Sequence, residues 1–190
     1  MCADPALSSL DERLAATYRE AIKAFGGTSP EDSKAGAAVK ADQRAWLAAR
    51  NACAADAACL RTAYERRLAV LGFRPDPAAP AATDRFVGRY DHRGFMEVSI
   101  LGLRDGQAAV HLTGAHPGDG RWVCGFEGIG RPDAQGRLVV GAPDSDGNGL
   151  IILAKGDGGI QVPEIDVNLA ASGNWCGAGG WFVLEYARKR

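Results

Sequence analysis

Glycine is distributed so unevenly along this chain that one kind of secondary structure throughout is excluded. Only four of the 25 glycines lie in the first 84 residues, where alanine is abundant instead. Alanine favours the helix, whereas glycine disfavours it because glycine loses more backbone freedom on ordering. The distribution predicts an α+β protein with a helical N-terminal part and a strand-rich C-terminal part.

Apolar residues of the N-terminal part recur at steps of three and four, which is the spacing of one helix face. The three stripes are Leu7, Leu10, Leu14, Tyr18, Ile22 and Phe25; Val39, Gln43, Trp46, Leu47 and Arg50; and Leu60, Tyr64, Leu68 and Leu71. Asp4 and Pro5 begin the first helix as N-cap and first-turn proline, and Gly26 and Gly27 end it. The second helix is expected to open at residues 29–32 and the third near Asp56.

Three short helices of this kind bury their apolar faces only by packing together, so we predict a three-helix bundle. We interpret the aromatic residues of the stripes as core, with a ligand groove as the alternative. Arg50 and Arg67 lie on or beside the stripes. We expect their stems to pack there and their guanidinium groups to lie in water or to pair with Asp11 and Glu65.

The C-terminal part consists of short β-favouring runs separated by glycine-rich turns. The candidate strands are Phe86–Tyr90, Phe95–Leu101, Ala108–Thr113, Arg121–Glu127, Leu138–Val140, Leu150–Ala154, Ile160–Val162 and Trp181–Tyr186. This pattern predicts a separate antiparallel eight-stranded β-barrel or sandwich. The first and last runs have similar patterns, and pairing them would remove exposed edges, so we expect them to be neighbours.

Residues 74–84 separate the two parts and contain three prolines, which interrupt both helix and sheet. We predict a helical domain at residues 1–73, a stiff extended linker at 74–84 and an all-β domain at 85–190.

Composition excludes several classes of protein. The formal net charge is -1 and 24% of residues are charged, which does not favour binding to nucleic acid. No apolar run approaches the roughly 18 residues that cross a bilayer, and Met1 leads straight into polar sequence. We expect a soluble chain, with a mature form that has lost its targeting segment as one interpretation.

Four of the five cysteines form natural pairs. Cys53 and Cys59 flank a segment short enough to be a turn between helices, and Cys124 and Cys176 both fall in the strand-rich part. In the chain-entropy model, a disulfide between the first pair would close a short loop and stabilise the fold by about 2 kcal/mol, and one between the second pair would close a longer loop and stabilise it by about 4 kcal/mol. The three histidines are not at metal-ligand spacing from any cysteine, which disfavours zinc. Two disulfides indicate an oxidising compartment.

The N-terminal residues also resemble a known family. The motifs that carry the resemblance are Cys2-x-Asp4-x-x-Leu7-x-x-Leu10-Asp11-x-x-Leu14-x-x-x-Tyr18, Gln43-Arg44-x-Trp46-Leu47-x-x-Arg50-x-x-Cys53 and Cys59-Leu60-x-x-x-Tyr64-x-x-Arg67-Leu68-x-x-Leu71. Residues 2 to 71 are similar to the N-terminal domain of the LprI-type lysozyme inhibitors of the bacterial envelope. The resemblance implies a periplasmic or outer-membrane-associated location and a role in restraining lysozyme.

Cys2 is left over from these pairs. Its interpretations are a free thiol, a lipid-bearing first residue in the native precursor, or a cysteine that has lost its disulfide partner. In the LprI-type family a further cysteine usually precedes this position. We therefore expect an engineered start at Met1 that removed both a signal peptide and that partner.

Two motifs of the strand-rich part have alternative interpretations. Residues 171–175 faintly resemble the Ser-Gly-x-x-Tyr motif of the barrel-shaped C-type lysozyme inhibitors, and the alternative is a glycine turn fixed by Cys176. Asp144, Asp146 and Asn148 match the first half of a Ca²⁺-binding loop. Because the twelfth position is Lys155, where a bidentate Glu is needed, we favour a hairpin loop and expect no cofactor.

The sequence contains no recognisable catalytic motif. Glu127, Glu164 and Glu185 lie far apart in the sequence, and Ser172 lies outside the Gly-x-Ser-x-Gly motif of a serine nucleophile. We therefore predict a binding protein that is not an enzyme, and three interpretations stay open. The first is an inhibitor that plugs the cleft of lysozyme or another peptidoglycan-degrading enzyme. The second is an immunity protein against a secreted muramidase such as a type VI effector, and the third is a non-inhibitory envelope binding module.

For the inhibitor, the candidate contact residues are Arg89, His92, Arg93, Ser172 and Asn174, all expected in loops. The near-neutral net charge favours a fit by shape over long-range steering.

Overall fold

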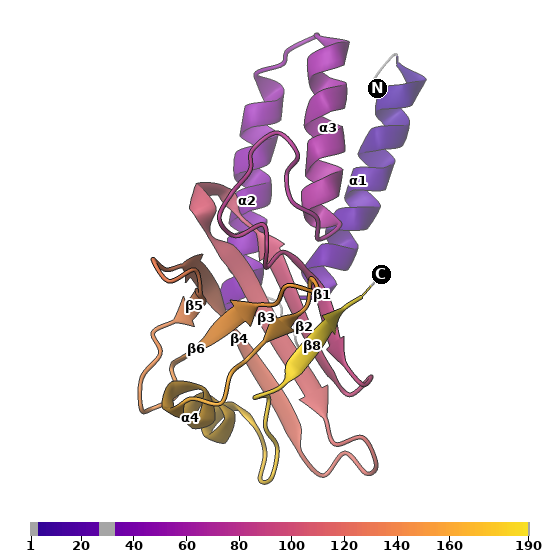
Figure 1. Cartoon of the computed structure of the whole chain (residues 1–190). Coiled ribbons are helices and arrows are strands. Elements are labelled where there is room, and N and C mark those ends of the chain that lie inside the picture. Colours follow the sequence, from indigo (N-terminus) through magenta and orange to yellow (C-terminus); the bar gives the residue numbers. More distant parts are fainter. Residues whose placement is uncertain (1–3, 27–32, 190) are drawn as a thin grey trace.

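The computed structural model describes residues 4–26 and 33–189, which form three N-terminal helices followed by an eight-stranded barrel with a fourth helix (Figure 1). The predicted α+β class is confirmed. Cys2 and the expected start of the second helix at residues 29–32 lie outside the described residues.

The three N-terminal helices are α1 (Pro5–Lys23), α2 (Lys34–Asn51) and α3 (Ala57–Leu71). Each begins with a side-chain cap. The Asp4 carboxylate accepts hydrogen bonds from the backbone of Ala6 and Leu7, and Asp56 caps α3 through Ala58 and Cys59 in the same way. These caps satisfy amide groups that have no partner inside the helix. α1 ends at Lys23, ahead of the glycines expected to end it.

The barrel is closed and antiparallel, with all eight predicted strands present in sequence order. They are β1 (Gly88–His92), β2 (Met96–Gly102), β3 (Ala108–Ala115), β4 (Val123–Pro132), β5 (Leu138–Gly141), β6 (Gly149–Ala154), β7 (Ile160–Gln161) and β8 (Glu185–Arg188). Side chains that alternate inward fill the interior with apolar groups. Closure leaves no unpaired edge between the first and last strands.

The pairing of β1 with β8 confirms the expected contact between the first and last strand-like runs. The two runs share more than strand propensity. The hydroxyl of Tyr90 donates to the carbonyl of Phe86, and that of Tyr186 donates to the carbonyl of Phe182, each four residues earlier. The same local arrangement therefore recurs on both sides of the seam, and the buried tyrosines satisfy their hydroxyl groups there.

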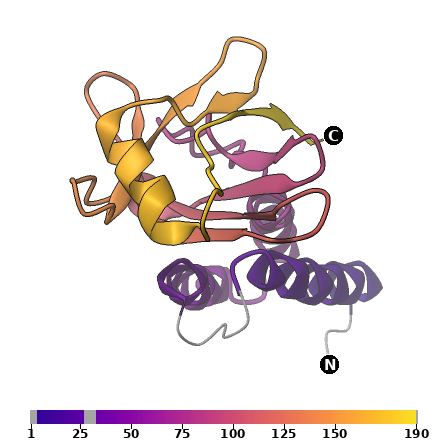
Figure 2. The ribbon, with the colours of Figure 1, turned by 90° about the horizontal axis from the view of Figure 1, so that it is seen from below.

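The helical bundle packs against the outer wall of the barrel (Figure 2). Leu101 and Ala109 of the wall belong to the same buried cluster as the helix residues. Glu127 of β4 fixes α2 by accepting hydrogen bonds from the Ser33 hydroxyl and, at 2.7 Å, from the Lys34 backbone. A carboxylate at a helix N-terminus also interacts favourably with the helix dipole. The barrel thus supplies part of the core and a cap for the helices.

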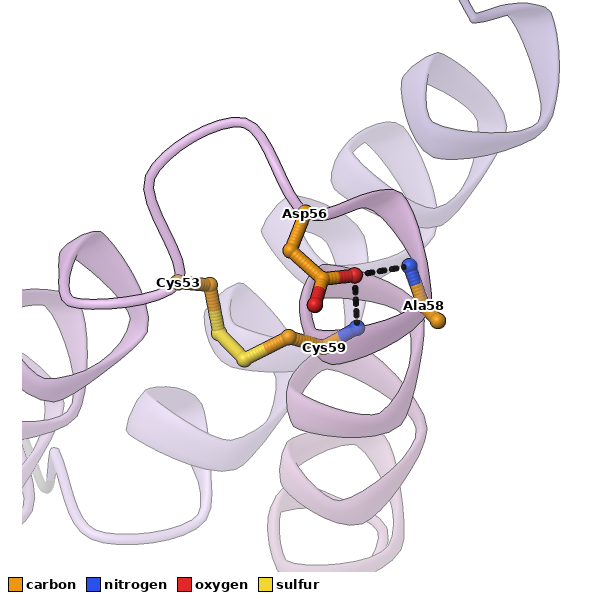
Figure 3. Close-up of a disulfide and its surroundings, with 4 residues drawn as sticks. All are labelled: Cys53, Asp56, Ala58 and Cys59. Atoms are coloured by element: carbon orange, nitrogen blue, oxygen red, sulfur yellow. Dashed lines mark hydrogen bonds between the residues drawn. A yellow bond between two sulfur atoms is a disulfide. The ribbon is translucent and has the colours of Figure 1, made fainter.

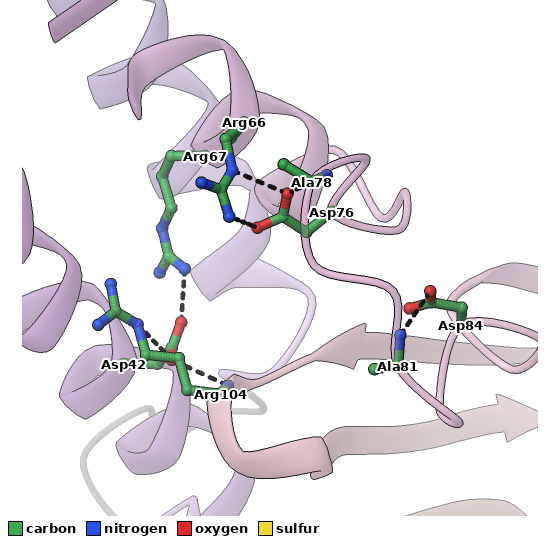
Figure 4. Close-up of polar contacts among 8 residues, drawn as sticks. All are labelled: Asp42, Arg66, Arg67, Asp76, Ala78, Ala81, Asp84 and Arg104. Carbon is green, nitrogen blue, oxygen red and sulfur yellow. Dashed lines mark hydrogen bonds and ion pairs between the residues drawn. The ribbon is translucent and has the colours of Figure 1, made fainter. Parts of the chain in front are cut away.

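The segment at residues 74–84 is not the extended spacer that its prolines predicted. It folds back through consecutive turns beside α3, and Asp76 forms two hydrogen bonds of 2.9 and 2.8 Å with Arg66. The Asp84 carboxylate accepts from the Ala81 backbone and closes a further turn (Figure 4). Local carboxylate contacts have overridden the stiffness that three prolines give a solvated chain. The proposed boundaries at residues 73 and 85 stay a prediction.

Candidate functional site

The residues that carry the family resemblance meet inside the helical bundle. Arg50 of α2 donates a hydrogen bond of 2.5 Å to the Tyr64 hydroxyl of α3, which in turn donates to Asp11 of α1 at 2.7 Å. The rings of Trp46 and Tyr64 meet edge to face at 5.6 Å, and the Arg50 guanidinium lies 5.5 Å from each ring centre. These contacts join all three helices. Trp46 and Tyr64 lie in the core as expected, whereas Arg50 reaches Asp11 through the Tyr64 hydroxyl and not by the expected direct pair.

Arg67 forms a second, fully buried network. Its guanidinium donates to the Gln43 side chain at 2.7 Å and to Asp42 at 2.5 Å. Asp42 also accepts from the Arg104 backbone, and Figure 4 shows both contacts of Asp42. Burial lowers the pKa of Arg67, and the Asp42 carboxylate opposes that shift. The expectation of a head in water or a pair with Glu65 was wrong, because Asp42 on the neighbouring helix offers a closer partner. Both networks hold the helices in place.

A disulfide joins Cys53 to Cys59 and closes the turn between α2 and α3, as predicted (Figure 3). A cavity of about 910 Å³ begins there and extends between these helices, residues 74–84 and the barrel. Two ion pairs lie in its walls, Arg66 with Asp76 and Arg67 with Asp42. The arrangement gives a cleft between the two halves of the molecule without an evident catalytic group.

The second predicted disulfide, Cys124–Cys176, fixes the other end of the barrel. It joins the start of β4 to the end of α4 (Asp166–Trp175), a helix that lies beside the mouth of the barrel in Figure 2. The Trp175 ring nitrogen donates to the Gly147 carbonyl at 2.8 Å. Gly147 has a φ of +75°, and a Cβ there would stand 2.7 Å from the Ala170 carbonyl. Glycine therefore allows the loop at 142–148 to contact α4 closely.

Helix α4 is the main element that sequence reasoning missed. Residues 171–175 form its last turns, so neither the proposed glycine turn nor a loop bearing a Ser-Gly-x-x-Tyr-like motif is present. Asn168 fixes this helix: its side chain accepts from the Ile151 backbone and donates to the carbonyls of Ile151 and Pro163. Asn168 is completely buried. Asn168 itself gives no helical signal in the sequence, because its partners lie on β6 and in the preceding loop.

An aromatic cluster lies under the same end of the barrel. Trp122 contacts Phe95, His116 and Trp181, with ring centres 5.8 to 6.3 Å apart. Trp122 is buried whereas Trp181 is half exposed. Each aromatic contact of this kind adds specific geometry to the burial of apolar surface. The cluster links the turn after β3 to the segment after α4, so this end is built from parts far apart in sequence.

The structure separates the five predicted contact residues. The Arg89 guanidinium lies 4.4 Å from the ring centre of Phe73, on the side of the barrel that faces the helices. His92 is the last residue of β1 and Arg93 begins the turn that follows, and His92 Nδ1 is 2.6 Å from the Glu185 carbonyl. Asn174 is exposed at the end of α4. His92, Arg93 and Asn174 thus belong to the α4 end of the barrel, and Arg89 does not.

Four of the five residues do not lie in loops as expected, since Arg89 and His92 belong to β1 and Ser172 and Asn174 to α4. Ser172 departs furthest from the expectation. It lies in α4, not in a loop, and is only 4% exposed. Its hydroxyl accepts a hydrogen bond of 3.2 Å from the Phe182 backbone. Because the side chain is buried and engaged within the molecule, a partner does not reach it in this conformation.

The candidate calcium residues form a hydrogen-bonded loop. One oxygen of Asp144 accepts from the backbone of Asp146 and Asn148, and the other accepts from the Asn148 amide at 2.8 Å. The Asn148 contacts lower the pKa of the Asp144 carboxyl. Across residues 4–26 and 33–189, no group of three or more His, Cys, Asp or Glu side chains is placed to hold a metal ion. The Asp144 oxygens serve the turn itself.

Comparison with known proteins finds a family that is similar to the helical half. Residues 1–74 match the family model described as Lysozyme inhibitor LprI, and the resemblance of the N-terminal motifs is confirmed. Curated relatives include Lipoprotein LprI from Mycobacterium bovis and from two strains of Mycobacterium tuberculosis. Each is 36% identical over 81 residues, which cover 41% of this chain and 36% of the relative. No solved structure gives a significant match.

These findings also bear on location. The relatives carry the name lipoprotein, and this chain contains two disulfides, which persist in oxidising compartments. Together they indicate an extracytoplasmic location in the cell envelope. Within the described part of the chain, no helix has the length and apolar character to cross a membrane.

Proposed function

We propose that this chain is an envelope protein that binds and inhibits lysozyme or another peptidoglycan-degrading enzyme. The observation that carries the proposal is the match of residues 1–74 to a family of lysozyme inhibitors. The matched segment spans about a third of the curated relatives, so the activity is proposed for this chain and not transferred from them. The compartment is the periplasm or the outer-membrane surface.

The architecture supports a mechanism in which a rigid protrusion occupies the cleft of the enzyme. The α4 end of the barrel is fixed by Cys124–Cys176 and by the buried amide of Asn168. A preorganised surface loses little conformational entropy on binding, so more of the contact energy appears as affinity. The motif residues of the helical half are engaged with one another inside the bundle, so the proposal does not assign them contacts with the enzyme. Inhibition therefore needs no chemical step by this chain.

The direct experiment is a cell-wall lysis assay followed by turbidity. A basic c-type lysozyme is mixed with increasing amounts of the full chain, and a cognate secreted muramidase is assayed in parallel. The proposal expects lysis by at least one enzyme to stop near equimolar ratio. Inhibition of the secreted muramidase alone would identify an immunity protein. Full activity of both enzymes at a hundredfold excess would contradict the proposal and favour a non-inhibitory binding module.

A further inference from the structure

Exposed apolar side chains gather at one end of this molecule. Of the six large hydrophobic residues that are exposed within the described residues, five lie at the α4 end of the barrel: Val123, Ile165, Leu169, Trp175 and Trp181. The sixth, Leu47, is on α2. Val123 is 61% exposed and Trp181 51%, values that leave most of each side chain in water. Scattered exposed apolar residues need no explanation, but a gathering of this kind marks an interaction surface.

The five residues are joined by the framework beneath them. Val123 and Trp175 are the chain neighbours of Cys124 and Cys176, and the disulfide holds them together. Trp181 lies against Trp122, the residue before Val123, at 6.2 Å between ring centres. Ile165 is the N-cap residue of α4, and its carbonyl accepts a hydrogen bond of 3.0 Å from the backbone of Leu169 in the first turn, so both lie at the start of this helix. The surface is therefore built on fixed elements and is not a mobile loop.

The charge at this end is acidic, which the net charge of the chain conceals. Residues 142–148 and 162–184, the two segments that carry and contact α4, contain four carboxylates and no Lys or Arg. The β1–β2 and β3–β4 connections at the same end, residues 91–95 and 116–122, each contain one acidic residue and one Arg, so the excess of negative charge remains. At the opposite end, the turns at 103–107, 133–137 and 155–159 each contain one acidic and one basic residue. The barrel thus presents one balanced end and one negative end. Local potential, not net charge, sets electrostatic steering of a partner.

Three of those carboxylates are free to face a partner. Asp146, Glu164 and Asp166 are exposed, and their side chains have no hydrogen-bond or ion-pair partner among residues 4–26 and 33–189. Asp144, by contrast, is engaged within its own turn. An unpaired carboxylate beside exposed Trp and Leu matches the usual anatomy of a binding surface, with an apolar centre and a charged rim.

We infer that this α4-end surface, made of the five apolar residues with Asp146, Glu164 and Asp166, is the docking site for a basic protein. The inference rests on the proposed function and names its surface: the occupant is a cationic peptidoglycan-degrading enzyme. The acidic rim attracts and orients the enzyme, and the tryptophans and Leu169 fill its cleft. This replaces the expectation, drawn from a net charge of -1, that shape alone guides binding.

The first test removes apolar contact. In the lysis assay with a basic c-type lysozyme, the double variant Leu169→Ser with Trp181→Ser should need at least tenfold more protein for half inhibition, because central apolar residues dominate interface energies. Leu47→Ser is the matched control, since Leu47 is similarly exposed but lies on α2. It should inhibit like the wild type. Both variants are compared with the wild type by thermal unfolding to establish that they fold.

The second test removes the rim charge. The triple variant Asp146→Asn, Glu164→Gln and Asp166→Asn should slow association with the same lysozyme about tenfold at low salt, with the difference shrinking at high salt. The control triple, Glu12→Gln, Glu65→Gln and Asp105→Asn, removes equal charge from exposed positions elsewhere. It should associate at close to the wild-type rate. Surface plasmon resonance at two ionic strengths measures both variants.

Each outcome decides between the two proposals. Wild-type potency in both the apolar and the charge variants would overturn the docking surface and leave lysozyme inhibition standing. A wild-type chain that leaves the enzyme active would instead overturn the proposed function together with the assigned partner. A dimer in size-exclusion chromatography that dissociates in the Leu169/Trp181 variant, without loss of inhibition, would assign the surface to a second copy and refute the inference.

Discussion

The barrel and the helical half differ in how their interiors are stabilised. The barrel core is a closed layer of apolar side chains, whereas the helical half buries the Arg67–Asp42 ion pair and takes Leu101 and Ala109 from the barrel wall to complete its core. Apolar packing tolerates changes of similar volume, but a buried ion pair fails when either partner is lost. The helical half is therefore the part whose fold depends on particular residue types.

This difference explains why the family resemblance lies where it does. The motif residues Arg50, Tyr64 and Arg67 form hydrogen bonds that depend on their guanidinium and phenol groups. The α4 end of the barrel, which we propose as the docking surface, lies outside the matched residues 1–74. The motif residues of the helical half thus stabilise the packing of the helices, and the surface that we propose for partner binding lies elsewhere in the molecule.

The largest expected effect tests the buried ion pair. Arg67→Ala should destabilise the protein by about 3–5 kcal/mol, because Asp42 would be left buried without its main charge partner. Arg66→Ala, which breaks the partly exposed pair with Asp76, should cost about 1 kcal/mol or less. Urea unfolding of both variants measures the difference. Equal losses would show that burial of the pair has no special role.

Removal of each disulfide in turn compares how much the two halves depend on a crosslink for their stability. Replacing Cys124 and Cys176 by Ser should cost about 4 kcal/mol, and replacing Cys53 and Cys59 about 2 kcal/mol, since the first bridge closes a longer loop. Thermal and chemical unfolding of the two double variants provide the measurement. A larger loss of unfolding free energy on removal of Cys53–Cys59 would contradict this ranking and show that the helical bundle depends more on its disulfide than the barrel does.

A smaller effect tests how α4 is held. Asn168→Ala should destabilise the protein by about 2 kcal/mol, because it leaves buried backbone groups of Ile151 without partners. Asn174→Ala, on the exposed side of the same helix, should stay within about 0.5 kcal/mol of wild type. Hydrogen exchange of residues 162–176 gives a local readout beside global unfolding. Unchanged protection in the Asn168 variant would refute its anchoring role.

The smallest effect concerns the contact between the halves. Burial lowers the pKa of His111, against a hydrogen bond with the Ala24 backbone and the charge of Glu127, which favour the protonated form. The folded state then binds fewer protons than the unfolded chain, so stability should fall as pH decreases just below the usual histidine pKa of about 6.5. Unfolding free energies at pH 7.5 and 5.5 measure this. His111→Gln should flatten the decrease, and an identical decrease in that variant would contradict it.

The sequence predicted those features of the fold that depend on the local spacing of residues. Three amphipathic helices, eight strands, the closure of β1 on β8 and two disulfides all follow from periodicity, turn residues and cysteine positions. They did not predict α4, because Asn168 finds its partners on a strand 17 residues earlier. Nor did they predict the cap that Glu127 gives to Ser33 and Lys34, which joins residues more than 90 positions apart. Such contacts leave no local signal.

The candidate site shows the same limit. Arg93, His92 and Asn174 stay predicted contact residues, although only Arg93 lies in a loop, because His92 ends β1 and Asn174 belongs to α4. Ser172 was misplaced, because its burial depends on the tertiary position of a helix that the sequence does not reveal. The acidic character of this end was equally hidden, since charges distant in sequence cancel in the total.

Hydrogen-exchange mass spectrometry of the full chain, alone and with a basic c-type lysozyme, tests the central claim most directly. The account predicts new protection in residues 142–148 and 162–184 when the enzyme is bound, with residues 34–71 unchanged. Protection confined to the helices would contradict the account, because the inhibitory surface would then lie in the half that we assign to folding and not at the acidic end of the barrel.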